Sequence, residues 1–209
     1  MITFEEIELR GPELRDVKSL HRNIREAETN PLLANAYYPL SSLGVEEFLK
    51  KKADDAREEK GYLFSIYVEG EGPLGLLELA NIDWKSRHLE LRIWVSQGFQ
   101  GRGYEKKAAT AGLHFAFREL GMHKVYAKCL ETDDVLRKLY EKAISFTEEG
   151  KLRGQTFHEG KYVGMLLFGM LEKEYNLLCG EKKVAIDTQK MTPRIVHREF
   201  KEGNKEPLY

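Results

Sequence analysis

The feature that most constrains this 209-residue chain is a strand-like apolar run that passes through three glycines directly into a helical pattern. The run is Leu89–Val95, the glycines are Gly98, Gly101 and Gly103, and apolar residues recur at helical spacing from Ala109. Such a junction leaves unpaired N–H groups at the positive end of the helix dipole, and the missing Cβ atoms let an anion come close. The junction therefore predicts an anion site, and phosphate is the anion that suits it.

The glycine spacing excludes two common phosphate sites. The stretch has neither the GxGxxG of a dinucleotide-binding fold nor the GK[ST] of a P-loop. The residues present are Gln100, Gly101, Arg102, Gly103, Tyr104 and Glu105. The alternative interpretation is an ordinary strand-to-helix connection in which the glycines only allow the chain to turn.

Hydrophobic periodicity predicts a strand, two helices, three strands, a helix, a strand, a helix and two strands, in that order. The expected strands lie at residues 2–10, 62–68, 74–82, 89–95, 124–130, 146–157 and 162–171. The expected helices lie around residues 14–27, 45–56, 109–120 and 136–143. This order indicates an α/β (mixed) fold with a central, mostly antiparallel sheet of about six to seven strands and helices packed on it.

The last part of the chain is more polar than the rest. It holds two weak strand-like runs, at residues 184–187 and 194–200. We therefore expect one domain over residues 1–175 and a C-terminal extension of unknown structure over residues 176–209. Strand exchange through this extension is compatible with a homodimer.

Composition bounds the partners and the compartment. Lys and Arg number 33 against 34 Asp and Glu, so the charge balance favours no nucleic-acid partner. No apolar run approaches membrane-spanning length, and the first residues lack the pattern of a signal peptide. With only Cys129 and Cys179 and no paired histidine spacing, we expect a cytoplasmic protein without a membrane partner, disulfide framework or metal site.

The stretch from Gln100 to Glu105 resembles the pyrophosphate-binding motif Q/R-x-x-G-x-G/A of the GNAT superfamily of N-acetyltransferases, which bind acetyl-CoA. Residues 77–95, "LELANIDWKSRHLELRIWV", are similar to the third and fourth strands of its RimJ/RimL-like branch, and residues 123–175 are similar to that branch's C-terminal half. The resemblance covers about four fifths of the chain. It implies a GNAT-like fold and an acetyl-CoA-dependent N-acetyltransferase.

Three positions depart from the pattern of the family. Glu105 stands where the motif usually has Gly or Ala, and Asp133 stands where relatives often have Asn. The segment "YEKAISF" is one residue longer than the usual "YEKLGF". Glu105, Asp133 and Arg92, which stands where relatives often have Gly, keep open an alternative function, a non-catalytic acyl-CoA-binding or regulatory module with the same fold.

The resemblance also implies which residues meet the co-substrate. The backbone of the strand before the loop is expected to pair with the pantetheine arm, and the loop N–H groups are expected to hold the pyrophosphate. The implied cofactor-binding residues are Ile93, Trp94, Val95, Gln100, Gly101, Arg102, Gly103, Tyr104, Glu105, Asp133 and Tyr140. Tyr140 is expected to act as the acid that protonates the departing sulfur, and core packing is its alternative role.

Amide formation from an ammonium also needs a base. Strand alternation places Glu90, Arg92 and Trp94 on one face of their strand. Glu90 matches the acidic residue of the RimJ/RimL-like strand and is the first candidate, with Glu78 in the neighbouring strand as the second. A base here requires burial to raise the pKa of the carboxyl, whereas an ion pair with Arg92 is the competing role for Glu90.

The acceptor is expected to be a protein N-terminus or a small amine such as a polyamine or an amino sugar. In relatives it is held by the two N-terminal helices, by the loop between them and by the last hairpin. That loop is residues 30–44 here, and Tyr37 and Tyr38 are its candidate lining residues.

Overall fold

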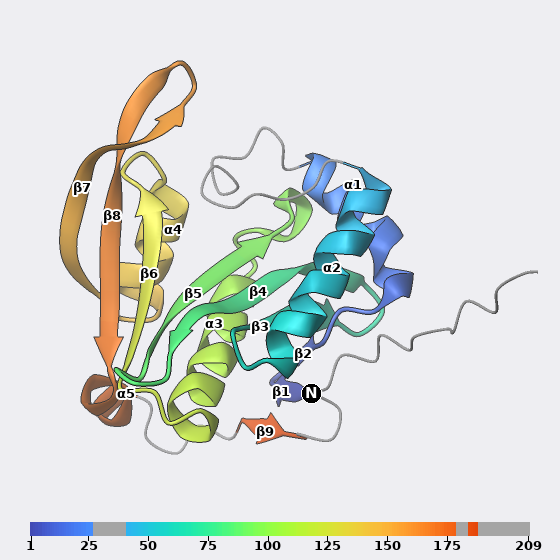
Figure 1. Cartoon of the computed structure of the whole chain (residues 1–209), viewed down its shortest axis with the longest axis horizontal. Helices are drawn as coiled ribbons and strands as arrows, with labels where there is room; N and C mark the ends of the chain where they lie inside the picture. Colours follow the sequence, from blue (N-terminus) through green and yellow to red (C-terminus); the bar gives the residue numbers. More distant parts are fainter. Residues whose placement is uncertain (27–40, 179–183, 188–209) are drawn as a thin grey trace, which may run out of the picture.

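The computed structural model describes residues 1–26, 41–178 and 184–187. Its strands are β1 (Ile2–Phe4), β2 (Ile7–Arg10), β3 (Tyr62–Val68), β4 (Gly72–Asp83), β5 (His88–Val95), β6 (Lys124–Leu130), β7 (Thr147–His158), β8 (Lys161–Leu171) and β9 (Ala185–Ile186). They form one sheet in the order β7-β8-β6-β5-β4-β3-β2-β1-β9 (Figure 1). The mixed α/β architecture is confirmed, and in the described part of the chain the sheet has nine strands rather than six to seven.

The helices cover both faces of this sheet. They are α1 (Val17–Glu26), α2 (Ser42–Arg57), α3 (Tyr104–His114), α4 (Asp134–Lys138) and α5 (Glu172–Leu178). Two of them continue as π-helical turns, η4 (Phe115–Glu119) after α3 and η5 (Leu139–Ala143) after α4. Helix α2 lies in front of β3 and β4 in Figure 1, and α3 lies behind the sheet.

The middle of the sheet is buried on both faces. Strands β3, β4 and β5 pair antiparallel, as predicted. On β5, Leu91 and Ile93 pack into the large core under α3, whereas Trp94 packs into a second cluster under α1 and α2. Helix α3 approaches β4 so closely that a Cβ on Gly112 would lie 2.9 Å from Leu77 Cδ1.

Strands β5 and β6 separate soon after they meet. They run parallel, and their register covers only three residue pairs, which end at Glu90 and Tyr126. Beyond that point β5 turns toward the glycine loop, while β6 stays paired with β8 along its other edge (Figure 1). The edge of β5 that faces β6 therefore has no strand partner over Leu91–Val95 among the described residues.

The chain returns through a long hairpin, β7 and β8, whose far end projects beyond the rest of the sheet (Figure 1). Its turn is Glu159–Gly160, with φ angles of 47° and 79°. Positive φ at both central residues is the geometry that two-residue hairpin turns favour. The predicted hairpin and its turn are confirmed.

The N-terminal segment differs from its prediction. A single strand was expected over residues 2–10, but Glu5 adopts a φ of 53° and the chain forms the hairpin β1–β2. The physical reason lies in the pattern itself, because Ile2 and Phe4 occupy even positions and Ile7 and Leu9 occupy odd ones. A hairpin turn keeps both pairs on the buried face, which one straight strand does not allow.

Part of the expected C-terminal extension is built into the fold. Helix α5 runs across the expected boundary after residue 175. Within the predicted run at residues 184–187, Ala185–Ile186 form the short strand β9, which pairs with β1. Tyr175 is 1% exposed, stacks on Phe117 at 4.8 Å between ring centroids, and its hydroxyl lies 3.0 Å from His114 Nδ1. The second predicted run, residues 194–200, lies outside the described residues.

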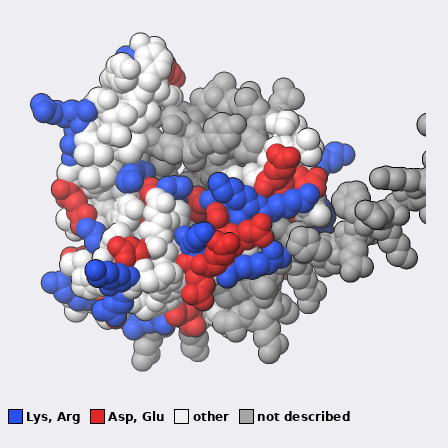
Figure 2. Space-filling model, viewed as in Figure 1, with Lys and Arg blue, Asp and Glu red and all other residues white. Residues whose placement is uncertain are grey.

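The surface carries charges of both signs. Figure 2 shows Lys and Arg side chains next to Asp and Glu side chains along α2 and across the middle of this face. Within the described ranges, no helix is long and apolar enough to cross a membrane.

Replacing Tyr175 with alanine should lower the free energy of unfolding by about 3 kcal/mol or more, because a buried ring and its polar contact are lost together. Leu177→Ala on the same helix is the matched control. Leu177 is 86% exposed, so that change should stay within about 0.5 kcal/mol. Urea unfolding measures both values, and equal values would mean that α5 does not contribute to the core.

Candidate active site

The glycine loop forms the entry to α3. Gly101 and Gly103 have φ angles of 74° and 85°, which is the left-handed region that glycine adopts without strain. Gly103 is the N-cap of α3, and its carbonyl accepts from Lys107 N at 3.1 Å. Apart from the chain neighbours, no heavy atom of the described residues lies within 4 Å of the Cβ position at either glycine. The loop therefore presents open backbone N–H groups at the positive end of a helix, as the sequence predicted for an anion site.

Glu105 reaches back into this loop. Its Oε1 lies 3.4 Å from the Gly101 N–H, which donates to it. An acidic side chain in the first turn of α3 thus occupies the position that a bound anion would take. Arg102 is the nearby cation of the loop, with its guanidinium 5.1 Å from the centre of the Phe99 ring and 3.9 Å from Glu71.

The other loop residues connect the strand to the helix. Gln100 donates through Nε2 to Val95 O at 2.9 Å and so braces the end of β5. Tyr104 is half-buried against the large core. Ile93 and Val95 face that core, and Trp94 faces α1 and α2. All three lie in the part of β5 that β6 leaves unpaired.

Tyr140 lies on the α3 side of the sheet, in the π-helical turn η5. Its side chain is 1% exposed and packs near Phe146 and Phe168, with ring centroids 6.0 Å and 5.5 Å away. Single π-turns accommodate one extra residue in a helix and are frequent at functional sites, so η5 accounts for the longer "YEKAISF" segment. Both expected roles, packing and contact with the co-substrate, are compatible with this position.

The electrostatic environment of Tyr140 links the two faces of the sheet. Burial raises the pKa of its phenol, Cys129, Asp133 and Glu90 act in the same direction, and Arg92 opposes them. The phenol is therefore protonated at any working pH and can donate. Glu90 and Arg92 belong to the opposite face of the sheet, so groups on both faces contribute to this shift.

Asp133 caps the helix that carries Tyr140. Its Oδ1 accepts from Leu136 N at 3.0 Å, and the side chain is buried. Its Oδ2 is buried as well and has no hydrogen-bond partner among the described residues. Burial raises the pKa of this carboxyl above its ordinary value. A buried oxygen without a partner is costly unless a ligand satisfies it.

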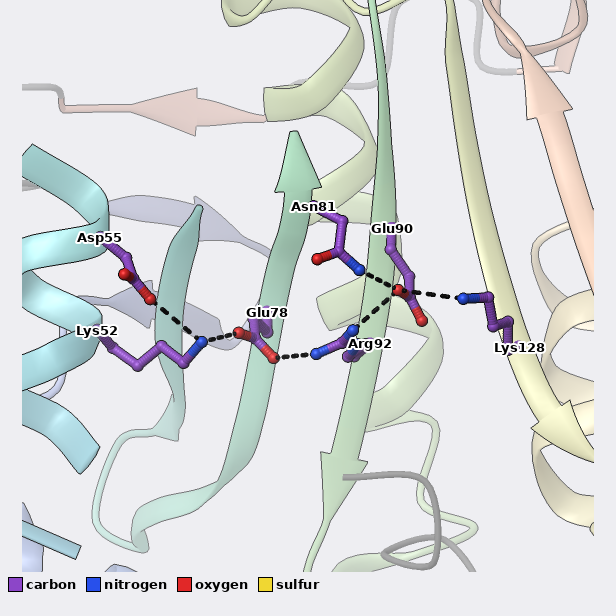
Figure 3. Close-up of polar contacts among 7 residues, drawn as sticks. All are labelled: Lys52, Asp55, Glu78, Asn81, Glu90, Arg92 and Lys128. Atoms are coloured by element: carbon purple, nitrogen blue, oxygen red, sulfur yellow. Dashed lines mark hydrogen bonds and ion pairs between the residues drawn. The ribbon is translucent and has the colours of Figure 1, made fainter. Parts of the chain in front are cut away.

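A chain of charges crosses the α2 face of the sheet (Figure 3). Lys52 of α2 lies 2.6 Å from Glu78, and Arg92 bridges Glu78 at 3.3 Å and Glu90 at 2.9 Å. Lys128 of β6 approaches Glu90 at 3.6 Å. The ion pair of Glu90 with Arg92, which the sequence raised as a competing role, is present.

Glu90 is held as a carboxylate. Burial acts to raise its pKa, but the hydrogen bond and charge of Arg92, the charge of Lys128 and the hydrogen bond from Asn81 outweigh it, so the pKa lies below the ordinary glutamate value. The raised pKa that a base would need is therefore not found in this state. All three contacts converge on Oε2, and none of them involves Oε1 (Figure 3).

Three members of this network were missed from the sequence. Lys52 and Lys128 come from α2 and β6, far from Glu90 along the chain, so only the fold brings them together. Asn81 lies at a β-bulge of β4 and has a φ of 51°, which a short polar side chain tolerates. The sequence did contain a signal for Asn81, because a polar Asn stands there within an otherwise apolar strand.

Other candidate residues stay outside the site. Cys129 is fully buried, and burial raises the pKa of its thiol to about 12, as befits a core residue. Within the described ranges, no group of three or more His, Cys, Asp or Glu side chains is arranged to hold a metal ion. Tyr37, Tyr38 and Cys179 lie outside the described residues.

Comparisons with known proteins agree with this geometry. A family model described as an acetyltransferase (GNAT) domain matches residues 6–143, more than half of the chain. YdaF of Bacillus subtilis, whose name assigns it provisionally as a ribosomal N-acetyltransferase, is 27% identical over 154 residues, which cover 73% of this chain and 77% of YdaF. Spermidine N(1)-acetyltransferase of Vibrio cholerae is 28% identical over 131 residues, 63% of this chain and 73% of that enzyme.

Solved structures show the same fold. RimL, a ribosomal L7/L12 alpha-N-protein acetyltransferase in complex with coenzyme A, aligns with a TM-score of 0.75 at 16% identity, over 81% of this chain and 96% of RimL. The family match and these relatives define an acetyl-CoA-dependent N-acetyltransferase. The chain belongs to the GNAT family of acetyltransferases and is similar to members of its RimJ/RimL-like branch.

Replacing Glu105 with glutamine should tighten acetyl-CoA binding by up to about tenfold at low salt, because a carboxylate no longer competes with the pyrophosphate for the Gly101 N–H. The gain should shrink as salt rises, since the loop faces solvent. Calorimetric titration across a salt series measures it. Glu172→Gln removes the same charge from the first turn of α5 and is the control. Unchanged or weaker binding by the Glu105 variant would contradict the prediction.

Proposed function

We propose that this enzyme transfers the acetyl group of acetyl-CoA directly to a primary amine, on a protein N-terminus or on a small molecule. The observation that carries the proposal is the pair of left-handed glycines before α3, next to the strand edge that β6 leaves unpaired. The relatives named for ribosomal-protein and spermidine acetylation support amine transfer, and they differ in the acceptor.

Three features of the chain fit acetyl-CoA. The N–H groups from Gly101 to Glu105 would hold the pyrophosphate, because the two glycines leave room for an anion. The free backbone edge over Ile93–Val95 would pair with the extended pantetheine arm. The buried Oδ2 of Asp133 is an acceptor that lacks a partner until a donor reaches it.

Acetyl transfer from a thioester requires a neutral amine, a stabilised oxyanion and a proton for the departing thiolate. Tyr140 would donate to the sulfur, and its raised pKa keeps that proton on the phenol. Glu90 would accept the proton of the incoming amine through Oε1, directly or through water, from the opposite face of the sheet. Glu78 is the second candidate, and its two carboxylate oxygens are engaged by Lys52 and Arg92.

Gly103→Asp should abolish acetyl-CoA binding, because it places a side chain and a like charge in the anion site and strains a left-handed residue. Gly121→Asp is the matched control. Gly121 also has a positive φ, of 63°, with no heavy atom near its Cβ position, and it follows the opposite end of the same helical segment. Calorimetric titration should show one site per chain in the control. Equal affinity in both variants would refute the loop assignment and, with it, the proposed co-substrate site.

Tyr140→Phe should lower kcat about a hundredfold while the Kd of acetyl-CoA changes less than about twofold, because a proton donor acts mainly in the transition state. Release of the CoA thiol measures turnover, and titration measures affinity. Tyr162→Phe makes the same change at the hairpin end, where Tyr162 is 74% exposed, and should alter neither quantity. Unchanged turnover in the Tyr140 variant would assign that residue to core packing.

A further inference from the structure

The charges that cross the α2 face are unequally exposed. The carboxylates of Glu78 and Glu90 are both buried, with 6% of each side chain exposed, whereas the side chains of Arg92 and Lys128 are 34% and 32% exposed. A molecule that approaches from solvent therefore meets the cations first. The buried carboxylates are accessible only behind them.

Two cations, Arg92 and Lys128, lie beside Glu90 where β5 and β6 separate, although the whole network balances three cations against three carboxylates. Glu78 pairs with Arg92 as well, and with Lys52. The third acidic residue, Asp55, lies 3.4 Å from Lys52 at the far end of the chain of charges. Lys128 approaches Glu90 only at 3.6 Å and lies 5.3 Å from the centre of the Tyr126 ring. Its charge is therefore incompletely neutralised.

The two carboxylate oxygens of Glu90 differ in their contacts beneath the exposed side chains of Arg92 and Lys128. Its Oε2 takes the contacts from Asn81, Arg92 and Lys128, and its Oε1 takes none of them (Figure 3). An amine drawn to Oε1 would lie beside two cations. The arrangement complements a molecule whose amine has an anionic group a few atoms away, and it repels a molecule that carries only positive charges.

We infer that the acceptor of this enzyme is a primary amine that bears its own carboxylate, with Arg92 and Lys128 as the residues that select it. This inference rests on the proposed acetyl transfer, because it places the acceptor amine on the α2 face at Glu90. Free amino acids and peptides with an acidic first residue share this chemistry. Spermidine, the substrate in the name of a Vibrio cholerae relative, carries only cationic groups.

The test compares acceptors that differ only in the carboxylate. The full chain is assayed for CoA-thiol release with glycine against glycinamide, C-terminally amidated peptides that begin with Asp against the same peptides that begin with Asn, and spermidine. Rates are expressed per concentration of unprotonated amine, because the amide changes the amine pKa. We expect the kcat/KM of the carboxylate member to be higher by about tenfold at low ionic strength, and this ratio to fall as salt screens the charges.

Matched variants assign the selectivity to the named residues. Lys128→Gln should lower kcat/KM about fivefold to tenfold for the carboxylate acceptor and less than about twofold for the neutral one. Lys124→Gln is the control, because Lys124 lies on the same strand and pairs with Glu149 at 2.6 Å, away from Glu90. Arg92→Lys keeps the charge and should retain most of the preference. A larger ratio with free amino acids or with Asp peptides identifies the source of the carboxylate.

Two results would overturn the inference, and they are distinguishable. If carboxylate and amide acceptors react equally, or if spermidine is the best acceptor, the selection by Arg92 and Lys128 is wrong while acetyl transfer stands. If no amine in the panel promotes thiol release although acetyl-CoA binds, the proposed function fails and the inference fails with it.

Discussion

The site depends on the short pairing of two parallel strands. Strands β5 and β6 share three residue pairs and then separate, because β5 is held by β4 and leads into the glycine loop while β6 is held by β8. Buried backbone groups normally find partners, so an unpaired strand edge inside a domain indicates a place for an extended ligand. Tyr140 lies on one face of the sheet and Glu90 on the other, and the charge of Glu90 is among the causes that raise the pKa of Tyr140.

The start of α3 balances stability against binding. A carboxylate in the first turn of a helix stabilises the free protein by about 0.3 to 1 kcal/mol, and Glu105 makes this contribution through its contact with Gly101 N. A pyrophosphate needs the same N–H groups and brings more negative charge. The departure from the family motif at Glu105 therefore does not remove the anion site, because the backbone geometry at Gly101 and Gly103 does not depend on that side chain. We expect it to change the affinity of the site.

Local patterns predicted most of the fold, whereas contacts between distant segments were not predictable. Alternation on β5 correctly placed Arg92 and Trp94 on the α2 face, and the glycines correctly marked the entry to α3. The hairpin at Glu5 was missed although the change from even to odd apolar positions signals it. Lys52 and Lys128 were missed for a different reason. Their proximity to the two glutamates depends on how α2 packs and on the register of the strands, and no periodicity in the sequence specifies either.

If an acceptor binds as proposed, the network that neutralises Glu90 also supplies a way to raise the pKa of this candidate base. Its pKa is low because Arg92 and Lys128 stabilise the charged form more than burial disfavours it. A carboxylate on the acceptor would also bind Arg92 and Lys128. Each contact that these two side chains make with the acceptor would be lost to Glu90. The charged form of a buried carboxyl then loses stabilisation, so its pKa rises toward the range that a base requires. An acceptor with only cationic groups cannot produce this change. Recognition of the acceptor and activation of the base would thus depend on the same two side chains.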